Sequence, residues 1–213
     1  MNDELRNVPE FPGGWPEWFD PTQDLMLTPR RLKGLLHPIR ARLLNLLESD
    51  GPATATQLGR RIGESSGVTS YHLRILAEHG FIEDDTERSN GRDRVWKTGF
   101  RGSAFTFRSP DDPVTREGVE TGAQYIRMLV DDYYRRMVTF LNGLSSHVEE
   151  LEDMPWTFSD VKIELTTEQG RALSAEVMAV VEKYRRPAGE HEAAEGAERG
   201  VFMFQMLPDE ALP

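Results

Sequence analysis

The sequence predicts a mostly helical α+β protein, in which short helices and a β-hairpin precede one long helix and a small C-terminal β-α-β unit. Three observations lead to this prediction. Apolar residues recur at helical spacing in most segments after Leu25. The pair Asn90-Gly91, a strong short signal for a hairpin, separates two short runs with strand character. An apolar seam with steps of three and four residues runs through the segment 113–151.

The first apolar repeat, between Leu25 and Leu47, is interrupted by His37-Pro38. Proline has no amide hydrogen for the preceding turn, yet it fits the first position of a helix. We therefore expect two helices that meet at a corner, the second of which begins at Pro38. Residues 49–53 contain Gly51-Pro52 and predict a turn.

Two short helices are expected next, about four residues apart. Thr54 and Gln57 have the spacing of a capping box, so they predict the start of the first helix. Ser65 or Ser66 caps the second helix, which runs to a stop at His79-Gly80. This arrangement is a candidate helix-turn-helix.

A two-stranded wing is expected to follow the second helix. Residues 81–86 and 94–97 have strand character, and the segment 87–93 joins them as a loop.

A long helix is expected from Pro113 to about Leu151, and its apolar seam predicts either pairing with a second copy or packing within the chain. Its expected inward positions are Val119, Ala123, Ile126, Val130, Tyr133, Met137, Phe140, Leu144, Val148 and Leu151.

The C-terminal part predicts a strand at 161–165, a helix capped by Thr166 with Gln169 three residues on, and a final strand at 201–207. The chain then divides into an arm at 1–21, a winged domain at 22–110, and a domain at 111–213 with the long helix and the β-α-β unit.

Charge is unevenly distributed along the chain, whose net charge is -11. Residues 22–110 hold 14 Lys and Arg against 10 Asp and Glu, whereas residues 111–213 hold 10 against 21. A polyanion site is therefore expected in the segment 22–110. The chain has no cysteine and no apolar run of about 20 residues, so we expect a cytoplasmic protein without membrane contact.

Residues 27–99 resemble the ArsR-like winged helix-turn-helix family of transcriptional regulators. The resemblance rests on the leucine-rich segment 32–47 around His37-Pro38, on Ser70-Tyr-His-Leu-Arg-Ile-Leu76 followed by Gly80-Phe-Ile82, and on Gly91-Arg-Asp-Arg-Val-Trp96 at the wing. The metal-sensing branch of the family has a cysteine-containing motif where this chain has residues 57–61. His147 and Glu150 alone have ligand spacing in the long helix, so no metal or other cofactor is expected.

The resemblance implies that the second short helix lies in the major groove of double-stranded DNA. Arg74 is then expected to bind guanine, and Thr69, Ser70 and Tyr71 to contact bases or phosphates. His72 is expected to pack or to bind a phosphate rather than a base. Expected backbone contacts on the first short helix and the wing are Arg60, Arg61, Arg88, Arg92 and Arg94.

A homodimer on a pseudo-palindromic operator is expected, because one unit of this size covers little DNA. The long helix would supply the interface. A small-molecule effector is a further hypothesis, with two readings for the C-terminal aromatic set: it lines an apolar cavity, or it is plain core. That set comprises Trp156, Phe158, Phe202, Met203 and Phe204.

Two other classes of function were compared with DNA binding. No motif for a nucleophile, a catalytic zinc or a nucleotide-binding loop is present in the sequence, which argues against an enzyme. The second class is a winged-helix adaptor that binds protein and not DNA, and the overall acidity favours it.

Overall fold

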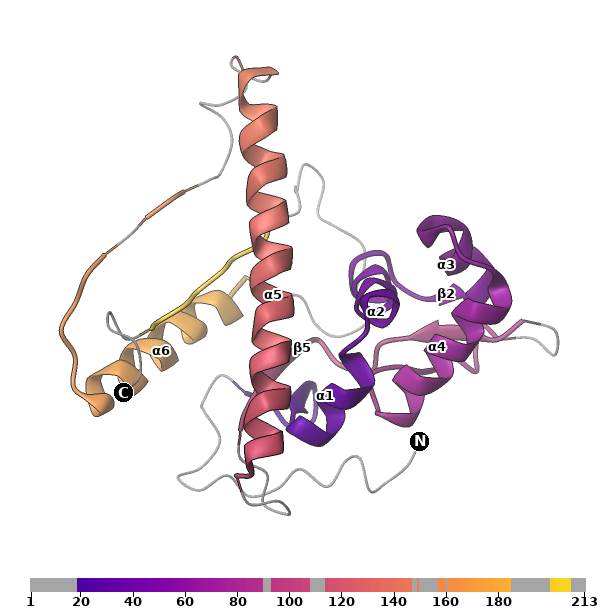
Figure 1. The fold of residues 1–213 in the computed structure, drawn as a ribbon, viewed down its shortest axis with the longest axis horizontal. Coiled ribbons are helices and arrows are strands. Elements are labelled where there is room, and N and C mark those ends of the chain that lie inside the picture. The colour runs from indigo at the N-terminus through magenta and orange to yellow at the C-terminus, as the bar shows by residue number, and fades with distance from the viewer. Residues whose placement is uncertain are drawn as a thin grey trace.

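The computed structural model describes residues 19–89, 93–107, 114–146, 149, 157–159, 161–184 and 200–207. Figure 1 shows a cluster of short helices and strands beside the long helix α5 (Arg116–Gly143), with α6 (Thr167–Glu182) on the other side of α5. The predicted fold class, mostly helical α+β, is confirmed. The predicted arm falls largely in residues 1–18, which lie outside the described residues.

Four short helices follow one another; the last three begin where the sequence predicts, and the first begins at Pro29, a start that no predicted cap specified. They are α1 (Pro29–Leu35), α2 (Pro38–Asp50), α3 (Ala55–Ile62) and α4 (Ser66–Glu78). Pro38 opens α2, and the capping box of Thr54 and Gln57 opens α3 with both of its hydrogen bonds present. Ser65, one of the two predicted caps of α4, accepts a hydrogen bond from the Val68 amide. These local signals are short-range hydrogen bonds, so the sequence alone reveals them.

Two small sheets complete this unit. The wing is confirmed as an antiparallel pair of β3 (Glu83–Asp84) and β4 (Val95–Lys97), and β2 (Ala53–Thr54) pairs with β4 on its other side. A second sheet pairs β1 (Asp24–Leu27) with β5 (Gly102–Phe105) in parallel. Neither β1, β2 nor β5 was predicted, because their partners lie far away in the sequence.

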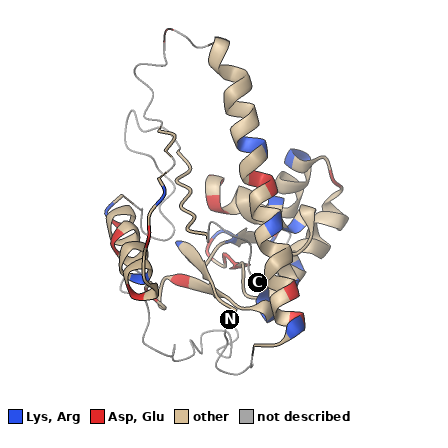
Figure 2. Cartoon of the chain, turned by 60° about the vertical axis from the view of Figure 1, so that its left-hand side comes forward, with Lys and Arg blue, Asp and Glu red and all other residues tan. Residues whose placement is uncertain are grey.

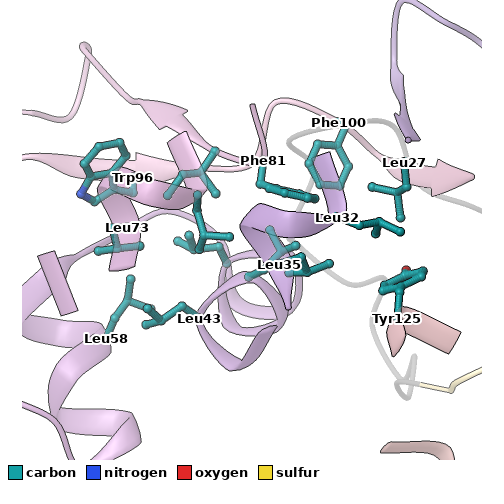
Figure 3. Close-up of a cluster of buried hydrophobic side chains, with 14 residues drawn as sticks. Leu27, Leu32, Leu35, Leu43, Leu58, Leu73, Phe81, Trp96, Phe100 and Tyr125 are labelled. Atoms are coloured by element: carbon teal, nitrogen blue, oxygen red, sulfur yellow. The ribbon is translucent and has the colours of Figure 1, made fainter. Parts of the chain in front are cut away.

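One apolar core holds the helices and both sheets together. Figure 3 shows its side chains, with Trp96 and Leu73 at one end and Leu27 and Tyr125 at the other. Burying a leucine side chain contributes about 1.5 to 3 kcal/mol. The fully buried leucines are Leu32, Leu43, Leu47, Leu58, Leu73 and Leu76.

Helix α5 is shorter than the predicted segment 113–151. Thr115 caps its start by accepting a hydrogen bond from the Gly118 amide at 3.0 Å. It ends at Gly143, a residue that disfavours helix, and a 3-10 turn (Leu144–Ser146) follows. Gly122 faces Phe105 and Phe107 so closely that a Cβ there would lie 2.5 Å from the Phe107 ring. No helix in the described ranges is both long and apolar enough to cross a bilayer.

The C-terminal unit differs from the predicted β-α-β arrangement. Helix α6 is confirmed, with the capping box of Thr166 and Gln169 at its start. The predicted strands at 161–165 and 201–207 are wrong in this chain, since both segments are exposed and neither is assigned to a strand. An alternating apolar pattern fits a strand, but a strand also needs a hydrogen-bonded neighbour, and the described residues supply none there.

A buried ion pair ties α6 to the β1-β5 sheet. Arg101 donates from Nε and Nη2 to the Asp24 carboxylate at 3.1 Å each, and its Nη1 lies 3.0 Å from the Glu182 carboxylate. The Asp24 side chain is only 1% exposed. Hydrogen bonding to Asp24 raises the pKa of Arg101 above its ordinary value.

Replacing Arg101 by Leu is expected to lower the free energy of unfolding by about 3 kcal/mol, because a buried carboxylate loses its charged partner. Urea denaturation followed by circular dichroism measures this loss. The double change Arg101→Leu with Asp24→Leu serves as the control and should recover part of the stability. If the single change has no effect, the ion pair does not hold this sheet.

Candidate nucleic-acid interface

Helices α3 and α4 are joined by a tight turn that fixes the direction of α4. Gly63 ends α3 with a φ of 78°, a left-handed conformation that favours glycine. A Cβ on Gly59 would lie 2.8 Å from the Glu64 carbonyl oxygen and 2.9 Å from Thr69 Oγ1. Glycine at this position therefore allows the two helices to approach closely.

The inward face of α4 includes two residues that were predicted to contact DNA. Thr69 is 0% exposed, and its hydroxyl donates a hydrogen bond to the Ser65 carbonyl at 2.9 Å. The prediction of a DNA contact from Thr69 is therefore wrong, because helical spacing places it beside Leu73 and Leu76 in the core. His72 is also buried, at 7% exposure. Of its two expected roles, the structure shows packing.

The outward face of α4 carries Ser70, Tyr71 and Arg74. Tyr71 is 57% exposed, Arg74 is exposed and Ser70 is half-buried. Within the described part of the chain Arg74 makes no hydrogen bond or ion pair, so its guanidinium is available. Val68, in the first turn of α4, lies on the accessible surface as well, with 39% exposure. It was not among the predicted contact residues.

The two arginines at the end of α3 differ in their contacts. Arg61 forms an ion pair with Asp50 at 2.7 Å, whereas Arg60 is exposed and has no ion-pair partner among the described residues. Both lie in the last turn of α3, where a positive charge also interacts favourably with the helix dipole.

The wing arginines are exposed but paired with carboxylates of the wing. Arg94 lies 2.9 Å from the Asp84 carboxylate and over the Trp96 ring, 5.2 Å from its centroid. Arg88 lies 3.3 Å from Asp85. Arg92, the third predicted wing contact, lies outside the described residues. The sequence pattern predicted positive charge at the wing but not its local neutralisation.

Basic and acidic residues occur together on the same helices. Figure 2 shows both basic and acidic residues along α5 and α6. A uniformly positive surface thus does not mark the candidate interface. On α4 the distinguishing feature is Arg74, which has no partner among the described residues.

The hypothesis of an apolar effector cavity has no support in the described ranges. No group of three or more His, Asp or Glu side chains there is placed to hold a metal ion. His147 lies outside these ranges, as does Trp156. Phe158 and Phe202 are 77% and 62% exposed, so they form neither a cavity nor a core in this chain. An open depression of about 400 Å³ lies elsewhere, along α5.

Residues 35–85 match the model of a family described as a helix-turn-helix domain. This segment, from the end of α1 to the start of the wing, is therefore a helix-turn-helix domain. The wing formed by β3 and β4 makes it a winged one. No curated protein matches the sequence.

Among solved structures, the chain is similar to a possible transcriptional regulator for arsenical resistance, with 27% identity, a TM-score of 0.29, and coverage of 51% of this chain and 93% of the other. It is also similar to the homodimeric winged helix-turn-helix DNA-binding domain Mb0332 from Mycobacterium bovis, a possible ArsR-family transcriptional regulator; the identity is 18%, the TM-score 0.32, and the coverage 51% and 82%. A mutant of Lactococcus lactis ZitR in its apo form is 13% identical, with a TM-score of 0.32 and coverage of 73% and 89%.

Gly59→Ala is expected to lower the free energy of unfolding by about 1 to 3 kcal/mol, because the new methyl group would overlap the Glu64 carbonyl and force α3 and α4 apart. Gly67→Ala is the matched control. Its Cβ would meet only Ser65 Oγ at 4.0 Å, and alanine favours helix more than glycine does. Chemical denaturation of both variants compares them, and equal stability would contradict close packing at Gly59.

Proposed function

We propose that this protein is a transcriptional regulator that binds double-stranded DNA sequence-specifically, as a homodimer on a pseudo-palindromic operator. The observation that carries the proposal is the outward face of α4, where the Arg74 guanidinium and the Tyr71 ring are exposed on a helix whose other face is locked into the core. The helix-turn-helix family match and the flanking wing support it.

Sequence reading is assigned to α4. An α-helix fits the major groove, and in a helix-turn-helix unit the N-terminal residues of the second helix contact base edges. Arg74 would donate two hydrogen bonds to guanine O6 and N7, while Ser70 and Tyr71 contact neighbouring bases or phosphates. Because Arg74 makes no ion pair with any residue in the described ranges, none of the observed ion pairs has to break for this contact.

Phosphate contacts are assigned to Arg60 and Arg61 on α3 and to Arg88, Arg92 and Arg94 on the wing. The ion pairs of Arg61, Arg88 and Arg94 are exposed on the arginine side, with side-chain exposures of 49%, 64% and 59%. Exposed pairs contribute about 0 to 1 kcal/mol. A DNA phosphate can therefore replace the carboxylate of Asp50 or Asp84 at little cost, and each replacement releases counterions from the DNA. Asp85 is buried, with 5% side-chain exposure, but it keeps Lys97 as a second partner when Arg88 turns to a phosphate.

Dimerisation is assigned to the seam of α5, defined as Val119, Ala123, Ile126, Val130, Tyr133, Met137, Phe140 and Leu144. Thr121, Gly122 and Tyr125, on the face of the helix that adjoins the seam, are buried against the same chain. Of the seam, Val119, Ile126 and Val130 are 43%, 41% and 48% exposed. Packing within the chain thus uses a different face of α5, and a second copy would cover the seam.

Arg74→Ala is expected to reduce discrimination between the selected operator and a random duplex, because a bidentate guanine contact is worth about 1 to 3 kcal/mol. Arg94→Ala is the matched control on the wing, and it should weaken binding to both duplexes alike. Operators selected from a random pool, followed by fluorescence anisotropy titrations, give the four affinities. Equal losses on both duplexes for Arg74→Ala would contradict base reading by this residue.

A salt titration separates this proposal from the adaptor alternative. Binding that neutralises several phosphates weakens steeply as salt rises. If the purified protein binds no duplex even at low salt, the DNA-binding proposal fails and the net charge of -11 favours the protein-binding alternative.

Val130→Glu is expected to convert the dimer to a monomer, because it places a charge in the middle of the apolar seam. Gln124→Glu adds the same charge at an exposed position away from the seam and should leave the dimer intact. Light scattering after size-exclusion chromatography gives both masses. A monomeric parent protein, or a Val130→Glu variant that remains a dimer, would exclude this interface.

A further inference from the structure

Three aromatic rings form a continuous stack from the α1-α2 corner to the outward face of α4. His37 caps α2, and its ring centroid lies 4.5 Å from that of His72 at an interplanar angle of 34°. The His72 ring in turn meets the Tyr71 ring edge-on, with centroids 5.2 Å apart and an angle of 69°. Tyr71, the exposed end of this stack, therefore leans on a buried histidine.

The same place holds two buried polar atoms without hydrogen bonds. They are Arg40 Nε and His72 Nδ1, and the described residues contain no other buried side-chain nitrogen or oxygen of this kind. A neutral imidazole tolerates an unpaired Nδ1 as an idle acceptor. Protonation would turn Nδ1 into a buried donor that lacks an acceptor, which adds to the cost of burying the charge.

The charged surroundings of His72 also oppose its protonation. Burial lowers the pKa of His72 below its ordinary value, and His37 and Arg40 act in the same direction. Glu64, in the turn before α4, acts in the opposite direction and raises the pKa of His72. Arg40 is itself close to Tyr71, which counteracts part of the lowering of the Arg40 pKa by burial.

We propose that neutral His72 is a positioning residue for DNA reading, whose ring fixes Tyr71 against the α1-α2 corner, and that protonation of His72 dismantles this stack and reduces sequence discrimination. This inference rests on the proposed function of α4. His72 is buried and is not proposed to contact a base. It acts through Tyr71.

The direction of the pH effect follows from proton linkage. The folded protein binds the proton of His72 less readily than the unfolded chain, whose histidine pKa is about 6.5. The folded state therefore loses stability relative to the unfolded state as pH falls below about 6.5, until the folded protein is protonated as well. In the folded protein the pKa of His72 is lower than in the unfolded chain, so His72 stays neutral above pH 6.5 and discrimination should be constant there.

The test compares affinities for the selected operator and for a random duplex, at fixed salt, at pH 7.5 and at a pH below the midpoint at which His72 titrates in the free folded protein. For the unmodified protein the ratio of the two affinities should fall by about tenfold at the lower pH, the scale of one lost base contact. His72→Phe keeps an aromatic ring that does not titrate, so its ratio should be high and equal at both pH values. His72→Gln removes the stack, and its ratio should be low at both.

A second measurement uses only the unmodified protein without DNA, so it does not depend on whether a variant folds. In an NMR titration of the free, unmodified protein, the His72 ring signals should titrate below pH 6.5, and the Tyr71 ring signals should shift over the same range. The unmodified protein could show no preference for the operator over a random duplex at any pH, while the Tyr71 signals still follow the titration of His72. In that case the proposed function is wrong, but the contact between His72 and Tyr71 is supported.

Three outcomes would overturn the inference. The first is an ordinary histidine pKa for His72, or Tyr71 signals that do not follow it. The second is a loss of discrimination in His72→Phe at the lower pH that equals the loss in the unmodified protein. The third is binding to both duplexes that strengthens equally with acid in the unmodified protein but not in His72→Phe, because this would make His72 a phosphate contact.

Discussion

The packing of α4 against α2 and α3 is the constraint on which the other features depend. Leu73 and Leu76 are fully buried, and Thr69 is sealed against the turn before α4. With these residues fixed inward, the 3.6-residue period leaves Tyr71 and Arg74 outward. Gly59 and Gly63 permit this packing, one by close approach and one by its left-handed backbone.

The electrostatic organisation is local rather than global. The net charge is -11, and Arg94 and Arg88 of the wing are paired with Asp84 and Asp85. Such pairs lower non-specific attraction to polyanions without removing the groups, since exposed pairs exchange partners at small cost. Arg60 and Arg74 are the exceptions, since neither has an ion-pair partner in the part of the chain that the structure describes, and Arg74 lies where selectivity would be decided.

Helix α5 serves two packing demands with two faces. Gly122 and Tyr125 pack on the β5 region and the core, while Ile126 and Val130 remain exposed. The apolar C-terminal segments 161–165 and 201–207 are also exposed, and nothing in the described part of the chain buries them. Phe158 and Phe202 are exposed although their sequence pattern suits burial, so the alternating pattern indicated apolar character correctly and assigned the partner wrongly.

The sequence by itself determined the starts of α2, α3, α4 and α6, the wing and the helix-turn-helix order, because caps, prolines and turns act over three or four residues. It also indicated which face of α4 holds Arg74. Only the tertiary structure decided that Thr69 and His72 are buried, that β1 pairs with β5, and that Arg101 joins Asp24 to Glu182. Those contacts join residues distant in the chain, and their energies depend on burial that no local pattern specifies.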